Sequence, residues 1–166
     1  MTTEKPIASL SLDLDNKWSY LKTHGDPGWE RLPSYLDVVV PRVLDFLEAR
    51  NLTITVFIVG QDAALDKNRE LLRAIAARHE IGNHSFHHEP WLHLYSEERT
   101  DTELGRAEEH IERATGQRPL GFRGRASASL RRRCGSWRDE GTATTPRRCR
   151  RFWDPWREPT TSCVPG

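Results

Sequence analysis

The chain has 166 residues, a length that suits one domain with a core of moderate size. Hydrophobic residues make up 36% and charged residues 30%, a polar composition that is not typical of a disordered chain. The formal net charge of +1 favours no particular partner. No stretch approaches the roughly 20 apolar residues that cross a bilayer. The polar start, residues 1–6, lacks the apolar segment of a secretory signal, so we expect a cytoplasmic protein without a membrane partner.

Two periodicities alternate along the first 123 residues. The segment IASLSLDLD alternates apolar and polar side chains, which predicts a strand with one buried face, and TITVFIVG predicts a strand buried on both faces. We expect strands over residues 7–15, 53–60, 80–84 and 119–123. We expect helices over residues 35–50 (capped by Ser34), 63–78 and 96–115, and a long loop over residues 16–33.

Polar side chains stand where these predicted strands end. Asp13 and Asp15 end the first strand. His84 follows the third, and Arg123 ends the fourth. Strands that alternate with helices indicate parallel β/α units, in which the chemistry gathers at the carboxyl ends of the strands. The pattern therefore predicts an α/β fold with a barrel-like active site at that end.

The segment GNHSFHH contains the strongest local signal. His84 and His88 are four residues apart, a spacing that places two imidazoles on one face of a helical turn. Imidazole nitrogen suits zinc and similar ions at about 2.0–2.1 Å. This spacing predicts a metal site, against the alternative of a solvated polar loop rich in histidine.

The aspartates of the first predicted strand supply a second signal. Residues two apart on a strand point to one face, and two carboxylates held there repel unless they share a cation or a proton. One of Asp13 and Asp15 can then ligate a metal while the other acts as a base; the alternative is a strand end that turns toward solvent. Two histidines, a carboxylate and an open position form the usual catalytic zinc set, which predicts metal-assisted hydrolysis of an amide or ester.

Four segments occur in an order that resembles the polysaccharide deacetylases, carbohydrate esterase family four: SLDLDNKW, TITVFIVG, HEIGNHSFHH and GFRG. The family's second motif, His-Ser/Thr-x-x-His, is matched by His84, Ser85 and His88, and GFRG resembles the start of its third motif, Arg-x-Pro. The resemblance covers roughly residues 7–124. It implies an α/β fold, an incomplete (β/α) barrel of the polysaccharide deacetylase type.

The resemblance also implies roles for individual residues. His84 and His88 would hold a divalent metal ion, zinc in the first place, and Arg123 would orient the catalytic base. We expect His87 and His93 to be loop residues rather than ligands.

The first motif departs from the usual Thr-Phe-Asp-Asp-Gly of the family. A leucine separates the two aspartates here, and Asn16 follows them. Strand geometry favours Asp13 as the base and Asp15 as the metal ligand. A shifted alignment instead makes Asp15 the base and Asn16 the ligand.

The chain departs from the family again after Gly124. The family's third motif continues Arg-Gly-Pro-Gly-Phe-Ser, but this chain reads Arg-Gly-Arg-Ala-Ser from Arg123, a change that one deleted base in GC-rich codons produces. Residues 125–166 are rich in arginine and contain no lysine. We therefore expect residues 1–124 to be the N-terminal part of a deacetylase domain and residues 125–166 to be an out-of-frame, unstructured tail. The alternative is a basic tail that binds nucleic acid through residues 147–151; we expect no such partner.

The motifs predict a metal-dependent hydrolase that removes acetyl groups from N-acetylated glycans, cleaving carbon–nitrogen bonds other than peptide bonds. The alternatives are a truncated, inactive remnant of such an enzyme and a metal-dependent amidase that acts on a small molecule. The expected partner is accordingly an acetylated glycan or a small amide, and the sequence sets no oligomeric state. Three tryptophans either stack on sugar rings or pack the loop against the barrel: Trp18, Trp29 and Trp91.

Overall fold

The computed structural model describes residues 8–124 of the 166-residue chain. The expected out-of-frame tail, residues 125–166, lies outside the described residues, so its reading frame and its nucleic-acid alternative stay predictions. Among the described residues, no helix has both the length and the apolar character needed to cross a membrane.

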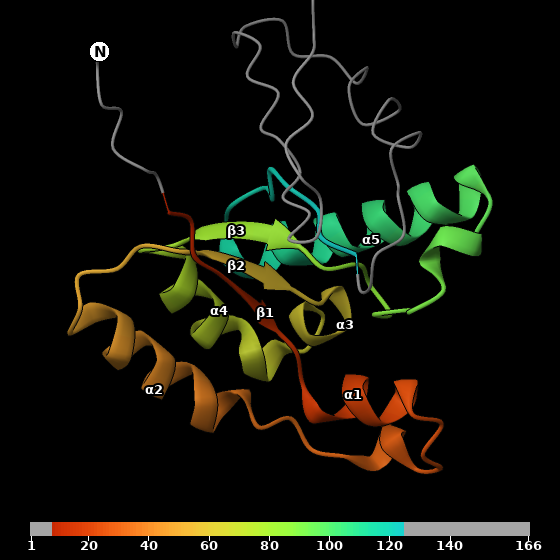
Figure 1. Cartoon of the computed structure of the whole chain (residues 1–166), viewed down its shortest axis with the longest axis horizontal. Helices are drawn as coiled ribbons and strands as arrows, with labels where there is room; N and C mark the ends of the chain where they lie inside the picture. The colour runs from red at the N-terminus through yellow and green to blue at the C-terminus, as the bar shows by residue number, and fades with distance from the viewer. Residues whose placement is uncertain (1–7, 125–166) are drawn as a thin grey trace, which may run out of the picture. The chain divides into compact units, whose positions relative to one another are not determined.

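Three parallel strands form the sheet, in the spatial order β1-β2-β3 (Figure 1). They are β1 (Ser11–Leu14), β2 (Thr55–Ile58) and β3 (Glu80–Asn83). The predicted fourth strand was wrong in extent, because residues 119–123 contribute a single parallel bridge between Phe122 and Asn83. The parallel order brings the carboxyl ends of the strands to one edge of the sheet.

The longer helices agree with the predicted ones. The helices are α1 (Lys17–Thr23), α2 (Leu36–Glu48), α3 (Gly60–Ala63), α4 (Arg69–Ala76) and α5 (Glu97–Thr115). Ser96 caps α5, since its side chain accepts a hydrogen bond from the backbone nitrogen of Arg99. Tyr35, rather than the predicted Ser34, occupies the capping position of α2.

Two predicted elements were wrong. Residues 16–33, expected as a loop, contain α1 and a 3-10 turn at Trp29–Arg31, because Asn16 caps α1 and Trp18 is buried. The helix expected over residues 63–78 is broken between α3 and α4 by a 3-10 turn at Asp66–Asn68. The side chain of Asn68 donates to the backbone oxygen of Asp62 there, which stabilises the turn.

One face of the sheet packs against the helices in a single core. Alternate strand residues point into this core: Leu14, Val56, Ile58 and Ile81. The helices contribute Leu36, Val40, Leu47, Leu72, Ile75, Ala107 and Ile111. Helix α4 contacts both α2 and α5, and α2 and α4 run beside each other in Figure 1. Successive β/α units with their helices on one face are the arrangement of part of a (β/α) barrel.

The opposite face of the sheet, here called the inner face, is largely polar. The register aligns Asp13, Phe57 and Gly82 in one row across the three strands. Two residues earlier on the same face, the hydroxyl of Thr55 donates to a carboxylate oxygen of Glu80 at 2.6 Å. Because the side chains of a strand alternate between its faces, the row of Asp13 presents its side chains away from the apolar core.

Candidate metal centre

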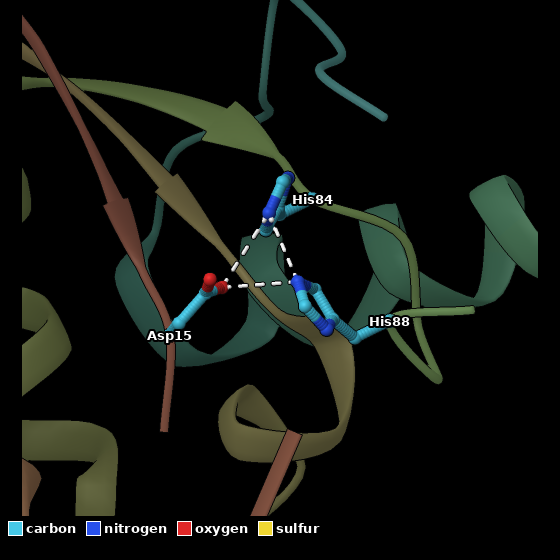
Figure 2. A group of neighbouring side chains, drawn as sticks. All are labelled: Asp15, His84 and His88. Atoms are coloured by element: carbon cyan, nitrogen blue, oxygen red, sulfur yellow. Dashed lines mark hydrogen bonds and ion pairs between the residues drawn. The ribbon is translucent and has the colours of Figure 1, made fainter. Parts of the chain in front are cut away.

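Asp15, His84 and His88 bring three ligand atoms together at the carboxyl edge of the sheet (Figure 2). Nε2 of His88 lies 3.1 Å from Oδ1 of Asp15 and 3.2 Å from Nε2 of His84. The third separation, between Nε2 of His84 and Oδ1 of Asp15, is 3.4 Å. Asp15 follows β1 and both histidines follow β3, so the parallel sheet creates this triangle from distant parts of the chain.

The spacing of the triangle fits a tetrahedral metal ion. Two ligand atoms about 2.0–2.1 Å from such an ion lie about 3.3–3.4 Å apart, close to the three separations found here. Oδ1 of Asp15 is buried and makes no hydrogen bond to the described residues, although the side chain as a whole is 41% exposed. A buried carboxylate oxygen facing two imidazole nitrogens needs a cation, so these residues fit a divalent ion.

The hydrogen bond of His84 sets its ring for metal binding. Nδ1 of His84 lies 2.6 Å from the backbone oxygen of Arg123. Because a carbonyl only accepts, we assign the ring hydrogen to Nδ1, which leaves Nε2 of the neutral ring with its lone pair. An outer hydrogen bond of this kind orients a histidine ligand and raises its basicity.

The loop that carries the two histidines is held by Asn83. Oδ1 of Asn83 accepts from the backbone nitrogen of Ser85 at 2.8 Å, and Nδ2 donates to the backbone oxygen of Leu104 at 3.0 Å. Ser85 and His88 have φ angles of 63° and 53°, which residues other than glycine seldom adopt. The two imidazoles therefore meet through a strained loop, and not through the helical turn suggested by their four-residue spacing.

Arg123 and Asp13 form an ion pair on the inner face of the sheet. Nη1 of Arg123 donates to Oδ1 of Asp13 at 2.7 Å, and Nη2 donates to the hydroxyl of Ser11 at 2.6 Å. The guanidinium carbon lies 4.1 Å from the ring centroid of Phe57. Three contacts thus fix the guanidinium, and through it the carboxylate of Asp13.

Asn16 does not join the ligand atoms. Its side chain is buried and donates to Oδ1 of Asp62 at 3.0 Å. The backbone oxygen of the preceding Asp15 accepts from the hydroxyl of Tyr35 at 2.8 Å. Of the two alignments that the sequence leaves open, only the one with Asp15 as ligand puts the ligand beside the histidines.

The pKa of Asp15 lies well below its usual range. Burial acts to raise this pKa, but the close contacts with His84 and His88 outweigh the burial. The carboxylate is therefore charged at neutral pH, which is the form that binds a metal ion.

The remaining candidates of the sequence lie apart from the triangle. Nδ1 of His87 is paired with Oε2 of Glu103 at 2.7 Å, and His93 is exposed. His87 lies in the loop after β3, whereas His93 lies in a 3-10 turn at Leu92–Leu94, and neither supplies an atom to the triangle.

The three tryptophans differ in their surroundings. Trp18 is buried and its ring centroid lies 5.7 Å from that of Trp29, so this pair packs the segment after β1 against the domain. Trp91 is 62% exposed. The packing interpretation therefore suits Trp18, whereas Trp29 is partly exposed and Trp91 has the exposed ring that stacking on a sugar requires.

Three residues around the site were missed from the sequence. Ser11 shares the face of Asp13 at two-residue spacing, and Asn83 directly precedes the histidine motif, so both carried a local signal. Tyr35 carried none, because its contact with Asp15 depends on how α2 packs.

Comparisons with known proteins agree with this fold. Residues 26–141 match the polysaccharide deacetylase family. A candidate polysaccharide deacetylase from Mycobacterium smegmatis is 31% identical, with a TM-score of 0.58 over 70% of this chain and 42% of that one. A family 4 carbohydrate esterase from Streptomyces lividans, in complex with acetate, is 27% identical. Its TM-score is 0.51, and the match covers 74% of this chain and 55% of the esterase. A family 4 acetyl xylan esterase from Clostridium thermocellum, 24% identical, shares the fold with a TM-score of 0.52. The match covers 69% of this chain and 46% of the esterase. No curated protein matches the chain.

The fold and the site together define a parallel α/β protein with polar residues gathered at the carboxyl edge of its sheet. The chain belongs to the polysaccharide deacetylase family, because the family match covers more than half of its length. This confirms the family and the α/β fold class predicted from the four motifs. The chain spans 42%, 55% and 46% of the lengths of the three solved structures named above.

Proposed function

We propose that this chain is a metal-dependent hydrolase that removes acetyl groups from N-acetylated glycans, at carbon–nitrogen bonds other than peptide bonds. The observation that carries the proposal is the triangle of Asp15, His84 and His88, with separations of 3.1, 3.2 and 3.4 Å. We propose zinc as the ion, since two imidazoles and a carboxylate hold catalytic zinc with a fourth position open.

The residues around the triangle suit hydrolysis. An ion held by Asp15, His84 and His88 supplies Lewis acidity, which polarises an acyl carbonyl and acidifies water. Asp13 serves as the general base that takes the proton of the attacking water. Arg123 orients the carboxylate of Asp13 through its 2.7 Å hydrogen bond.

Family membership supports an acetylated carbohydrate as the substrate class. The likeness to the family 4 carbohydrate esterase from Streptomyces lividans points the same way. The glycan would approach the inner face of the sheet, where Asp13 is 36% exposed and therefore accessible. A small amide is the other substrate class that this chemistry allows.

Titration of the purified 166-residue chain with Zn²⁺, combined with measurement of acetate release from acetylated chitooligomers, tests the proposal. We expect the wild-type chain to bind zinc and His84→Ala and His88→Ala to lose that binding. His93→Ala is the matched control, because it removes an exposed histidine from the same region. Unchanged zinc binding in the first two variants would show that the ligand assignment is wrong.

A metal-binding chain without turnover is a second candidate. It is favoured by the exposure of the Asp13–Arg123 pair, whose side chains are 36% and 30% exposed, because water weakens an ion pair that orients a base. Zinc binding without acetate release would support this candidate, and acetate release would exclude it. Turnover of a small acetylated amine but not of the oligomers would indicate the small-molecule amidase.

A further inference from the structure

Asp62 is a deeply buried carboxylate, 1% exposed, in the short helix α3 that follows β2. Its Oδ1 accepts hydrogen bonds from Nε1 of Trp18 and from Nδ2 of Asn16, both at 3.0 Å. Its backbone oxygen accepts from Nδ2 of Asn68 at 2.8 Å. Both the side chain and the backbone of Asp62 are therefore held in one position, yet none of these contacts uses the second carboxylate oxygen.

Two complementary buried atoms lack partners. Oδ2 of Asp62 and Nδ1 of His88 are both buried, and neither has a hydrogen-bond partner among the described residues. An imidazole whose Nε2 lone pair is directed at a metal ion carries its hydrogen on Nδ1, and a carboxylate oxygen accepts such a hydrogen. In Figure 2 the Nδ1 side of the His88 ring points away from Asp15 and His84, so this atom is turned outward from the triangle.

The charges of the candidate metal centre also affect the pKa of Asp62. Burial raises the pKa of Asp62, and the hydrogen bonds from Trp18 and Asn16 oppose this rise. His88 lowers the same pKa and Asp15 raises it, so both lie within electrostatic range of the carboxylate. A carboxylate buried this deeply is costly to charge unless positive charge lies nearby.

The charges balance when a divalent ion occupies the triangle. Asp13 is already paired with Arg123, and neutral imidazoles contribute no charge. Asp15 would match one of the two positive charges of the ion. An ionised Asp62 would match the second without being a ligand.

We propose that Asp62 is a positioning residue of the metal centre, an inference that rests on the proposed function. Its Oδ1 holds Asn16, and thereby the neighbouring ligand Asp15. With an ion in the triangle, we expect its Oδ2 to accept the Nδ1 hydrogen of His88, a hydrogen bond that the structure itself does not make. Asp62 touches neither the ion nor the substrate and acts through these two ligands.

The first test compares the Zn²⁺ affinity of the full chain with that of Asp62→Asn. Asparagine keeps the shape of the side chain but removes its charge. Its amide nitrogen is a donor, so it cannot accept a hydrogen bond from whichever donor it faces, His88 on one side or Asn16 and Trp18 on the other. We expect Zn²⁺ affinity to fall about 10–100-fold, the usual effect of losing an outer partner of a metal ligand. Glu108→Gln is the matched control: Glu108 is also a buried carboxylate, paired with Arg118 rather than with a candidate ligand. Its affinity should equal that of the wild type.

Two spectroscopic measurements separate positioning from a merely structural role. The visible spectrum of the Co²⁺-loaded chain reports the ligand geometry, and we expect it to change in Asp62→Asn but not in Glu108→Gln. In the zinc-loaded wild type, nitrogen-15 NMR should show a slowly exchanging hydrogen on Nδ1 of His88. The Nδ1 hydrogen of His84, bound to the backbone of Arg123, serves as the internal reference.

The results distinguish a failure of the role proposed for Asp62 from a failure of the proposed function. Zinc affinity of Asp62→Asn within twofold of the wild type, with an unchanged Co²⁺ spectrum, would overturn the role of Asp62 and leave the proposed function standing. A wild-type chain that binds no zinc would overturn the proposed function and this inference with it. If Asp62→Asn does not fold, the wild-type NMR measurement decides, because a rapidly exchanging or absent Nδ1 hydrogen on His88 contradicts the inference.

Discussion

Gly82 lies in β3 directly beside Phe57 of β2, and the structure predicts that even a methyl group at this position disturbs the ion pair between Asp13 and Arg123. A Cβ atom on Gly82 would lie 2.4 and 2.5 Å from two carbon atoms of the Phe57 ring. Ordinary contacts between carbon atoms are about 3.5–4.0 Å, so in Gly82→Ala the ring must retreat by about 1 Å. The guanidinium of Arg123 lies over that ring, 4.1 Å from its centroid, and would be displaced from Asp13.

The cost follows from the packing around Phe57. The ring is only 9% exposed, so it cannot swing freely into solvent. Overpacking of this kind costs about 1–3 kcal/mol, which lowers the melting temperature of a domain of this size by about 4–15 °C. A shift of about 1 Å also breaks the 2.7 Å hydrogen bond between Arg123 and Asp13, so acetate release should fall as well.

Thermal melting of a double-mutant cycle measures this effect. Phe57→Leu removes the ring that the new methyl group meets, so Gly82→Ala combined with Phe57→Leu should recover about 1–2 kcal/mol of the loss. Gly105→Ala is the control, because nothing lies within 4 Å of a Cβ on this exposed helical glycine. It should stabilise the chain by about 0.5–1 kcal/mol. A Gly82→Ala chain that melts with the wild type, or a cycle without coupling, would refute the reasoning.

Three further predictions concern stability. Ser96→Ala removes the cap that binds the backbone nitrogen of Arg99, and urea unfolding should show a loss of about 1 kcal/mol. Gly60→Ala places a Cβ 2.7 Å from the Cα of Ala107, so α3 and α5 must separate, and thermal melting should show a loss of about 1–3 kcal/mol. His79 is buried and its pKa is lowered by burial, so the unfolded chain takes up a proton at a higher pH than the folded chain. The stability from the neutral ring is thus present above about pH 6.5 and is lost as the pH falls, and His79→Leu should flatten unfolding curves measured between about pH 7 and 5.

The elements predicted from periodicity were those whose apolar side chains face one continuous core. Alternation in residues 7–15 and the β-branched run at residues 53–60 predicted β1 and β2, although both observed strands are shorter. The end of β1 depends on where pairing with β2 stops, and no local pattern encodes that limit. The helix after Ser96 could be predicted because its cap and its apolar stripe are both local.

The elements that were predicted wrongly depend on contacts between distant residues. Helix α1 lies in a segment of loop-like composition, but burial of Trp18 and its bond to Asp62, 44 residues away, stabilise it there. The break between α3 and α4 depends on the bond from Asn68 to the backbone of Asp62. Such contacts exist only once the chain has folded, so local propensity could not reveal them.

The sequence by itself determined the family and the chemical types at the candidate site: two histidines, two aspartates and an arginine at the ends of strands. Only the tertiary structure decided which atoms meet. Asp15 lies 3.4 Å from His84 because parallel pairing aligns β1 with β3 through β2, and Asn16 is turned away toward Asp62. His88 reaches the same point through a backbone of positive φ. Distances of this kind depend on register and on strained loop geometry, which arise from packing across the whole domain and leave no trace in residue spacing.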